Sequence, residues 1–279
     1  MSLKKIIRES LINLYEGLDP DKLPDHKYYA FDWDDNLMYM PTKIILKDDN
    51  GNEVPMSTED FAEHRHQIGK EDFDYNGHKI VGYADQPYRN FREGGDKQFK
   101  IDAMKAKTGP AWSDFVEAIN NGSIFSIITA RGHNPETIKD AIYNLIVSDH
   151  QGINKDLLLK NLRKYRDISG MEDKSDMDLI KDYLDMNKYY PVSFLDPSGA
   201  GNPEELKVAA MKEFISYVKN EAKKIGQKLY LKNDVKNKFV PSVGFSDDDL
   251  RNVETMKKHF EDEPVLKNYY TGKGTKTRY

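Results

Sequence analysis

Acidic side chains gather at two points of the sequence, each directly after an apolar segment. The run YYAF, residues 28–31, leads into Asp32, Asp34 and Asp35, and the run VGFS, residues 243–246, leads into three consecutive aspartates. Carboxylates at the end of a buried strand are costly to desolvate unless a cation lies among them. Oxygen ligands in a chain without cysteine suit a hard divalent ion, Mg²⁺ in particular. The two acidic groups therefore predict one magnesium site, provided that the fold brings them together.

Strands and helices are expected to alternate along most of the chain. Apolar runs typical of buried strands occur at residues 27–32, 123–130, 189–196 and 239–249. The segments between them have helical patterns, so we predict an α/β fold with a Rossmann-like, doubly wound and mainly parallel sheet. The carboxyl ends of such strands meet along one edge. Asp32, Asp34, Thr129 and the aspartates at 247–249 are therefore expected to converge there.

The patterns divide the chain into a core and three additions. The parts are an N-terminal helical arm at 1–26, a core at 27–40 and 110–262, a cap insertion at 41–109 and a basic tail at 263–279. The insertion opens with a hairpin pattern around Asn50-Gly51 and continues with a short helix capped at Ser57 or Thr58. The tail has four basic and no acidic residues after Leu266, and we expect it to be disordered.

Composition narrows the classes of function. The chain has 279 residues, of which 38% are hydrophobic, so a sizeable core is expected. A formal charge of −5 argues against non-specific electrostatic binding of nucleic acid. The absence of cysteine excludes thiolate catalysis and Cys-ligated zinc. No segment approaches the roughly 18 consecutive apolar residues of a membrane span. We expect a cytoplasmic protein with no membrane partner, and the oligomeric state is not indicated.

Four segments together resemble the motifs of haloacid dehalogenase-like (HAD) phosphohydrolases. AFDWDDNL is similar to the first motif, FSIITARG to the second, and VGFSDDDLRNVETM to the acidic fourth. Lys207 in NPEELKVAAM is the best match to the single lysine of the third motif, with Lys212 as the alternative. The motifs occur in the order of the family, and the resemblance covers residues 27–40 and 110–260.

The resemblance implies a Mg²⁺-dependent phosphatase that hydrolyses a phosphomonoester. Asp32 would attack phosphorus to form an aspartyl-phosphate. Asp34 would protonate the leaving oxygen and then activate water. Thr129 would hydrogen-bond a phosphoryl oxygen, and Lys207 would offset charge on the nucleophile and the phosphoryl group.

The resemblance also implies ligands for the metal. Mg²⁺ would be bound by the Asp32 carboxylate, the backbone carbonyl of Asp34 and one acid of the last motif, with Asp248 the first choice and Asp247 the second. Arg131 follows the second motif and would either bind phosphate or form an ion pair with the acidic cluster.

Two other residues near the first motif complete the expectations for the site. Asn36, four positions after Asp32, is the second candidate for substrate contact after Arg131. Asp35 has no assigned role and is interpreted as a solvated turn residue.

The substrate is expected to be a small phosphorylated molecule, a nucleotide or a nucleic-acid end, although the evidence for nucleic acid is weak. The insertion offers Arg89 and Arg92 beside Tyr88 and Phe91, which suits a base or a second phosphate, but an amphipathic surface is the more common interpretation. Two alternatives remain open: a catalytically idle binding or structural protein of this fold, and a phosphotransferase that uses the same aspartyl-phosphate.

Overall fold

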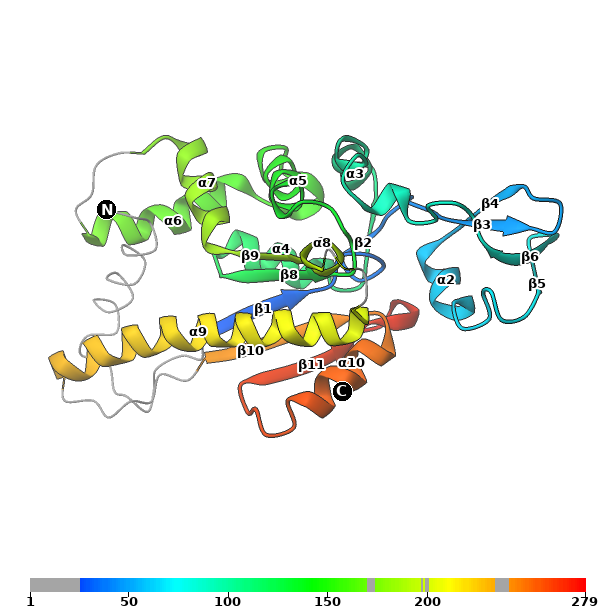
Figure 1. The fold of residues 1–279 in the computed structure, drawn as a ribbon. Helices are drawn as coiled ribbons and strands as arrows, with labels where there is room; N and C mark the ends of the chain where they lie inside the picture. The colour runs from blue at the N-terminus through cyan, green and yellow to red at the C-terminus, as the bar shows by residue number, and fades with distance from the viewer. Residues whose placement is uncertain (1–25, 170–173, 197, 199–200, 234–240) are drawn as a thin grey trace.

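A six-stranded, largely parallel sheet forms the centre of the protein (Figure 1). The computed structural model describes residues 26–279 apart from 170–173, 197, 199–200 and 234–240. The strand order is β12-β11-β10-β1-β8-β9. The bounds are β1 His26–Phe31, β8 Phe125–Thr129, β9 Lys188–Pro191, β10 Pro241–Asp247, β11 Leu266–Tyr270 and β12 Thr277–Arg278. Every neighbouring pair is parallel except β11 and β12, so the carboxyl ends of five strands lie along one edge.

Helices cover both faces of this sheet, and each face has its own apolar cluster. On one face, Phe31, Phe125 and Ile127 pack against four helices: α4 Trp112–Asn120, α5 Pro135–Val147, α6 Lys155–Ser169 and α7 Asp176–Met186. On the other, Ala30 and Phe245 pack against α9 Pro203–Asn233 and α10 Leu250–His259. The chain is therefore a mixed α/β protein, and all five residues of β8 are buried, as predicted for a strand covered on both faces. Within the part of the chain that the structure describes, no helix combines the length and the apolar composition needed to cross a membrane.

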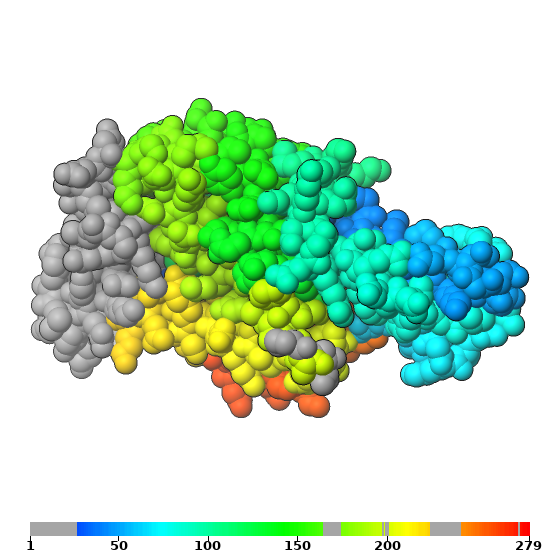
Figure 2. All heavy atoms as spheres, turned by 45° about the horizontal axis from the view of Figure 1, so that its top comes forward, coloured from blue at the N-terminus to red at the C-terminus, as the bar shows by residue number. Residues whose placement is uncertain are grey.

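Residues between β1 and α4 build a second, antiparallel sheet with the order β4-β3-β6-β5. Its elements are β3 Ile44–Asp48, β4 Glu53–Met56, α2 Thr58–His64, β5 Phe73–Tyr75 and β6 His78–Tyr83. The predicted hairpin is confirmed by the pairing of β3 with β4, and the helix cap is Ser57, whose side chain accepts from the backbone N–H of Asp60. A separate apolar cluster that includes Leu46 and Ile80 supports this sheet, and Figures 1 and 2 show it as a lobe at one end of the molecule.

Short elements connect the lobe to the core. They are β2 Met38–Tyr39, η2 Arg89–Phe91, α3 Asp96–Ala103 and β7 Lys107–Thr108. β2 pairs with β7, so the chain leaves and re-enters the core through one antiparallel ribbon. The 3₁₀ helix η3 His150–Gly152 lies between α5 and α6.

Two expectations about the core are wrong, and a third lies outside the described residues. The segment 263–279 is not disordered: it adds β11 and β12 to the sheet, with the 3₁₀ helix η4 Gly272–Gly274 between them, and Asn268 and Thr271 are buried there. The strand expected at 189–196 stops at Pro191, which has no N–H to continue a ladder, and α8 Val192–Leu195 follows. Of the arm expected at 1–26, the structure describes only His26, which opens β1.

Candidate active site

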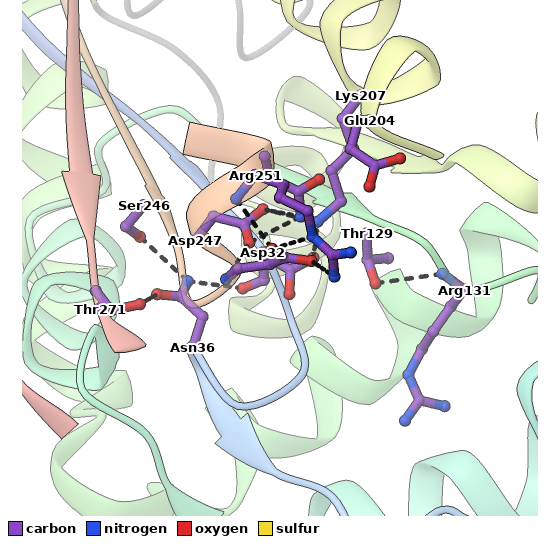
Figure 3. Close-up of polar contacts among 12 residues, drawn as sticks. Asp32, Asn36, Thr129, Arg131, Glu204, Lys207, Ser246, Asp247, Arg251 and Thr271 are labelled. Carbon is purple, nitrogen blue, oxygen red and sulfur yellow. Dashed lines mark hydrogen bonds and ion pairs between the residues drawn. The ribbon is translucent and has the colours of Figure 1, made fainter. Parts of the chain in front are cut away.

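Three neighbouring strands deliver polar side chains to the same edge of the central sheet (Figure 3). β1 lies between β10 and β8, with Phe31 paired to Ser246 on one side and to Ile127 on the other. Asp32 directly follows β1, and its backbone N–H donates to the Ser246 carbonyl at 3.0 Å. Thr129 ends β8 and Asp247 ends β10. The structure therefore brings together the strand ends that the sequence predicts to converge.

Lys207 of α9 joins two of these carboxylates. Its Nζ lies 2.8 Å from Asp32 Oδ1 and 2.7 Å from Asp247 Oδ2, and its side chain is 3% exposed. Burial alone would lower the pKa of Lys207, but the charges of Asp247 and Asp32 raise it above its ordinary value. Lys212, the alternative in the sequence, is exposed on the same helix. The ammonium group of the site is therefore that of Lys207.

Three carboxylates lie close together at this edge, and two of them contact the ammonium group. Asp32, Asp247 and Asp248 each offer a carboxylate oxygen, and these atoms all lie within 4.8 Å of one another. Burial raises the pKa of Asp32 to about 8, with Lys207 opposing the shift and Asp247 and Asp34 adding to it. Burial, followed by the charges of Asp247 and Asp32, also raises the pKa of Asp248 well above its ordinary value. One lysine does not balance three close carboxylates, and their oxygens form a donor set that fits a hard divalent cation.

Asp247 is held in place by the start of α10. Asn252 Nδ2 donates to both of its carboxylate oxygens, at 2.9 and 3.1 Å, and the backbone N–H of Asp249 donates to Asp247 Oδ1 at 2.9 Å. No role for Asn252 is predicted from the sequence, although it occupies the usual position after the acidic motif and lies in the first turn of a helix that follows three aspartates.

Arg131 forms an ion pair with Asp34. Its Nε and Nη2 donate to the two Asp34 oxygens at 2.8 and 2.6 Å, and Nη2 also lies 3.1 Å from Thr42 Oγ1. The guanidinium carbon lies 4.7 and 4.8 Å from the ring centroids of Phe91 and Phe99, and the residue is 1% exposed. The ion-pair interpretation is therefore confirmed, while Nη1 is buried with no hydrogen-bond partner among the described residues. The contact of Arg131 with substrate stays a prediction.

Asn36 is a structural cross-link, and its contact with substrate stays a prediction. The residue is fully buried. Its Nδ2 donates to the Asp32 carbonyl at 2.9 Å and to Ser246 Oγ at 3.1 Å, while its Oδ1 accepts from Thr271 Oγ1 at 2.7 Å (Figure 3). Both ends of the amide are engaged, so Asn36 ties the ends of β1, β10 and β11 together behind the carboxylates.

Thr129 and Asp35 complete the surroundings of Asp32 and Asp34. Thr129 is buried, and its Oγ1 accepts from the Arg131 backbone N–H at 3.4 Å. Asp35 has a left-handed backbone with φ 54°, and burial and the charge of Asp34 raise its pKa to about 6. Its side chain bonds Thr58, at the start of α2. Asp35 is therefore not the fully solvated turn residue that was expected.

A pH effect on stability is expected from His133, which follows the second motif. The residue is fully buried, and neither ring nitrogen has a hydrogen-bond partner among the described residues. Burial, then the charge of Arg131, lowers its pKa from 6.5 to about 4, although Asp96 and Asp34 act in the opposite direction. The unfolded chain therefore binds the proton first as the pH falls below about 6.5, and the folded state loses stability until about pH 4.

Urea unfolding measures this effect. Between about pH 7.5 and about pH 5, His133 is expected to cost the folded protein about 2 kcal/mol. His133→Leu should reduce the pH dependence of the unfolding free energy by that amount, while His66→Gln, at an exposed position, should leave it unchanged. Equal pH dependence in the wild type and His133→Leu would show that His133 is not held neutral by burial.

Comparison of the chain with protein-family models, with curated proteins and with solved structures finds no match.

Proposed function

We propose that this chain is a Mg²⁺-dependent phosphatase of the HAD-like type, with a Rossmann-like core, that hydrolyses phosphomonoesters through an aspartyl-phosphate. One observation carries the proposal: Asp32, Asp247 and Asp248 meet at the ends of parallel strands, with Lys207 Nζ at 2.8 Å from the first and 2.7 Å from the second. In a core with a purely structural role, burying more carboxylates than ammonium groups would only destabilise the fold. A phosphoryl site needs a cation, a nucleophile and a fixed positive side chain in one place.

The first step transfers the phosphoryl group to the protein. An oxygen of Asp32 forms a bond to phosphorus as the ester P–O bond breaks, and the leaving oxygen takes a proton from Asp34. Lys207, fixed between Asp32 and Asp247, offsets negative charge on the nucleophile and the incoming phosphoryl group. Bound Mg²⁺, held by Asp32, Asp247 and Asp248, would supply further charge neutralisation. Thr129 lies at the same edge as a hydrogen-bond donor to a phosphoryl oxygen.

The second step returns the enzyme to its starting state. Water attacks phosphorus, its proton passes to Asp34, and the bond between Asp32 and phosphorus breaks to release inorganic phosphate. Both oxygens of Asp34 accept bonds from Arg131. One of these bonds has to lengthen while Asp34 holds the proton, so Arg131 acts by positioning Asp34.

Phosphate release from a panel of phosphate esters tests the proposal. We expect turnover with Mg²⁺, a loss of at least about 100-fold when EDTA removes the metal, and recovery when Mg²⁺ is restored, because the carboxylates repel an anionic substrate without it. Release that is insensitive to EDTA would contradict the metal site. Release that occurs only when an acceptor alcohol is supplied would instead indicate phosphotransfer, and no release from any ester would favour a binding protein.

A further inference from the structure

The insertion carries a group of three aromatic rings, Phe61, Tyr83 and Tyr88, which we call the aromatic platform. The ring centroids lie 5.9 Å apart for Phe61 and Tyr88, 6.0 Å for Tyr83 and Tyr88, and 6.4 Å for Phe61 and Tyr83. Phe61 and Tyr88 pack against the apolar cluster of the insertion, and this packing holds their rings in place. Tyr83, at the end of β6, is 40% exposed. The platform is thus a rigid base with one ring open to solvent.

Two arginines place the platform beside the candidate active site. Arg65, at the end of α2, reaches the core: its Nη2 lies 2.6 Å from Glu204 Oε1 and 3.3 Å from Asp249 Oδ2. Glu204 lies in the first turn of α9, which carries Lys207, and Asp249 caps α10. One face of the insertion therefore touches the helix starts that border the carboxylates.

Arg92 makes the second connection. Its backbone forms a parallel bridge with Gly132, in the loop that follows Thr129, and the Gly132 N–H donates to the Phe91 carbonyl at 2.7 Å. Burial and then Tyr83 raise the pKa of Tyr88, and the positive charges of Arg65 and Arg92 both oppose this rise. The platform therefore lies on the side of the insertion that faces the site.

The arginines of this region differ in their partners. Arg89 is bound by both oxygens of Glu53, at 3.0 and 2.6 Å, within the insertion itself. Arg92 is exposed, and no ion pair or side-chain hydrogen bond involves its guanidinium group among the described residues. An exposed arginine without a side-chain partner, in the same insertion as an exposed aromatic ring, suits a ligand that combines a planar ring with hydrogen-bond acceptors.

We propose that the aromatic platform and Arg92 bind the leaving group of the substrate, and that this leaving group carries a nucleobase. The inference rests on the proposed phosphatase function and specifies its substrate class, a nucleoside phosphate. The base stacks on Tyr83, Arg92 donates to oxygen atoms of the nucleoside, and the ester phosphate points to Asp32. Stacking tolerates any base because every base has a π-face. A mononucleotide and the phosphorylated end of an oligonucleotide share this chemistry.

The kinetic test compares a nucleoside monophosphate, an oligonucleotide with a terminal phosphate and a phosphate ester of a small aliphatic alcohol. The wild type should show a higher kcat/KM for the nucleoside phosphates than for the aliphatic ester. Tyr83→Ala should lower that ratio about ten-fold, and Tyr83→Phe, which keeps the ring, should restore it. Arg92→Ala should lower the ratio about three-fold, whereas the matched control Arg89→Ala should leave it unchanged. The two nucleoside substrates show which source fits better, since the net charge of −5 disfavours a long polyanion.

A binding measurement separates this inference from the proposed function. Full-length Asp32→Asn protein is titrated with the nucleoside monophosphate, and with inorganic phosphate as a ligand that has no base. Tyr83→Ala in this background should weaken nucleotide binding about ten-fold and change phosphate binding by less than two-fold. If no ester is hydrolysed but this difference is found, the phosphatase proposal fails and the nucleotide surface stands. Equal loss for both ligands, or a wild-type enzyme that does not prefer the nucleoside phosphates, overturns the inference.

Discussion

Asp32→Asn is expected to lower Mg²⁺-dependent phosphate release by at least about 10³-fold, because an amide cannot form the aspartyl-phosphate. The fold should survive the change. Asn can still accept from Lys207 Nζ, which lies 2.8 Å from Asp32 Oδ1, and one negative charge is removed from a cluster that has too many. Initial rates of phosphate release and a urea unfolding curve, measured on the same preparation, separate lost chemistry from lost structure.

Asp35→Asn is the matched control for this variant. It makes the same chemical change three residues away, at a position whose φ of 54° asparagine tolerates well. We expect its rate to lie within about three-fold of the wild type, since the side chain bonds Thr58 of the insertion and does not belong to the carboxylate group around Lys207. An Asp32→Asn enzyme that keeps more than about a tenth of the wild-type rate would exclude Asp32 as the nucleophile.

Lys207→Met is expected to destabilise the fold by about 3–5 kcal/mol and to abolish turnover. Removing one partner of a buried ion pair leaves uncompensated charge, and here two carboxylates, Asp32 and Asp247, lose the same ammonium group. Lys212→Met, on the exposed side of the same helix, should change the unfolding free energy by less than about 0.5 kcal/mol. Urea unfolding without and with Mg²⁺ measures both variants.

A double variant shows whether charge is the cause. Adding Asp247→Asn to Lys207→Met removes one of the unpaired carboxylates, so part of the lost stability should return without any return of activity. Equal stability of Lys207→Met and Lys212→Met would show that the buried contacts of Lys207 do not support the fold.

Three strands of the central sheet, β1, β8 and β10, could be predicted because each of them leaves a local signal. β8 is apolar at three of its five positions and is bounded by turn residues. β1 is followed by Asp32, and β10 ends in Asp247, acids that a strand interior would not tolerate. Parallel order then requires their carboxyl ends to meet, so Asp32, Thr129 and Asp247 could be placed together before any coordinates were known. The lysine could be narrowed to two positions, and the structure selects Lys207 because only its side chain is buried against the acids.

Contacts between residues that are distant in the sequence could not be predicted. Asn36 lies near Asp32 in the sequence, but its partners Ser246 and Thr271 come from the far end of the chain. No local sequence pattern indicates these two hydrogen bonds. β11 was missed because Lys267 and the basic residues after it conceal a strand that is buried at Asn268. Arg131 was correctly linked to the acids as one of two options, but its enclosure by Phe91 and Phe99 depends on how the insertion folds back onto the core.

The order of the strands in space has a consequence for biosynthesis. β1 ends at Phe31, yet the neighbour on one of its edges, β10, begins only at Pro241. While the nascent chain emerges from the ribosome, β1 can pair with β8 long before β10 has been synthesised. During that time the backbone N–H and C=O groups on the other edge of β1 have no strand partner. Lys207 is translated before Asp247, so Asp32 can gain its positive neighbour before the second acid arrives. A ribosome stalled between these two residues would expose an unfinished sheet edge, to which we expect a chaperone to bind.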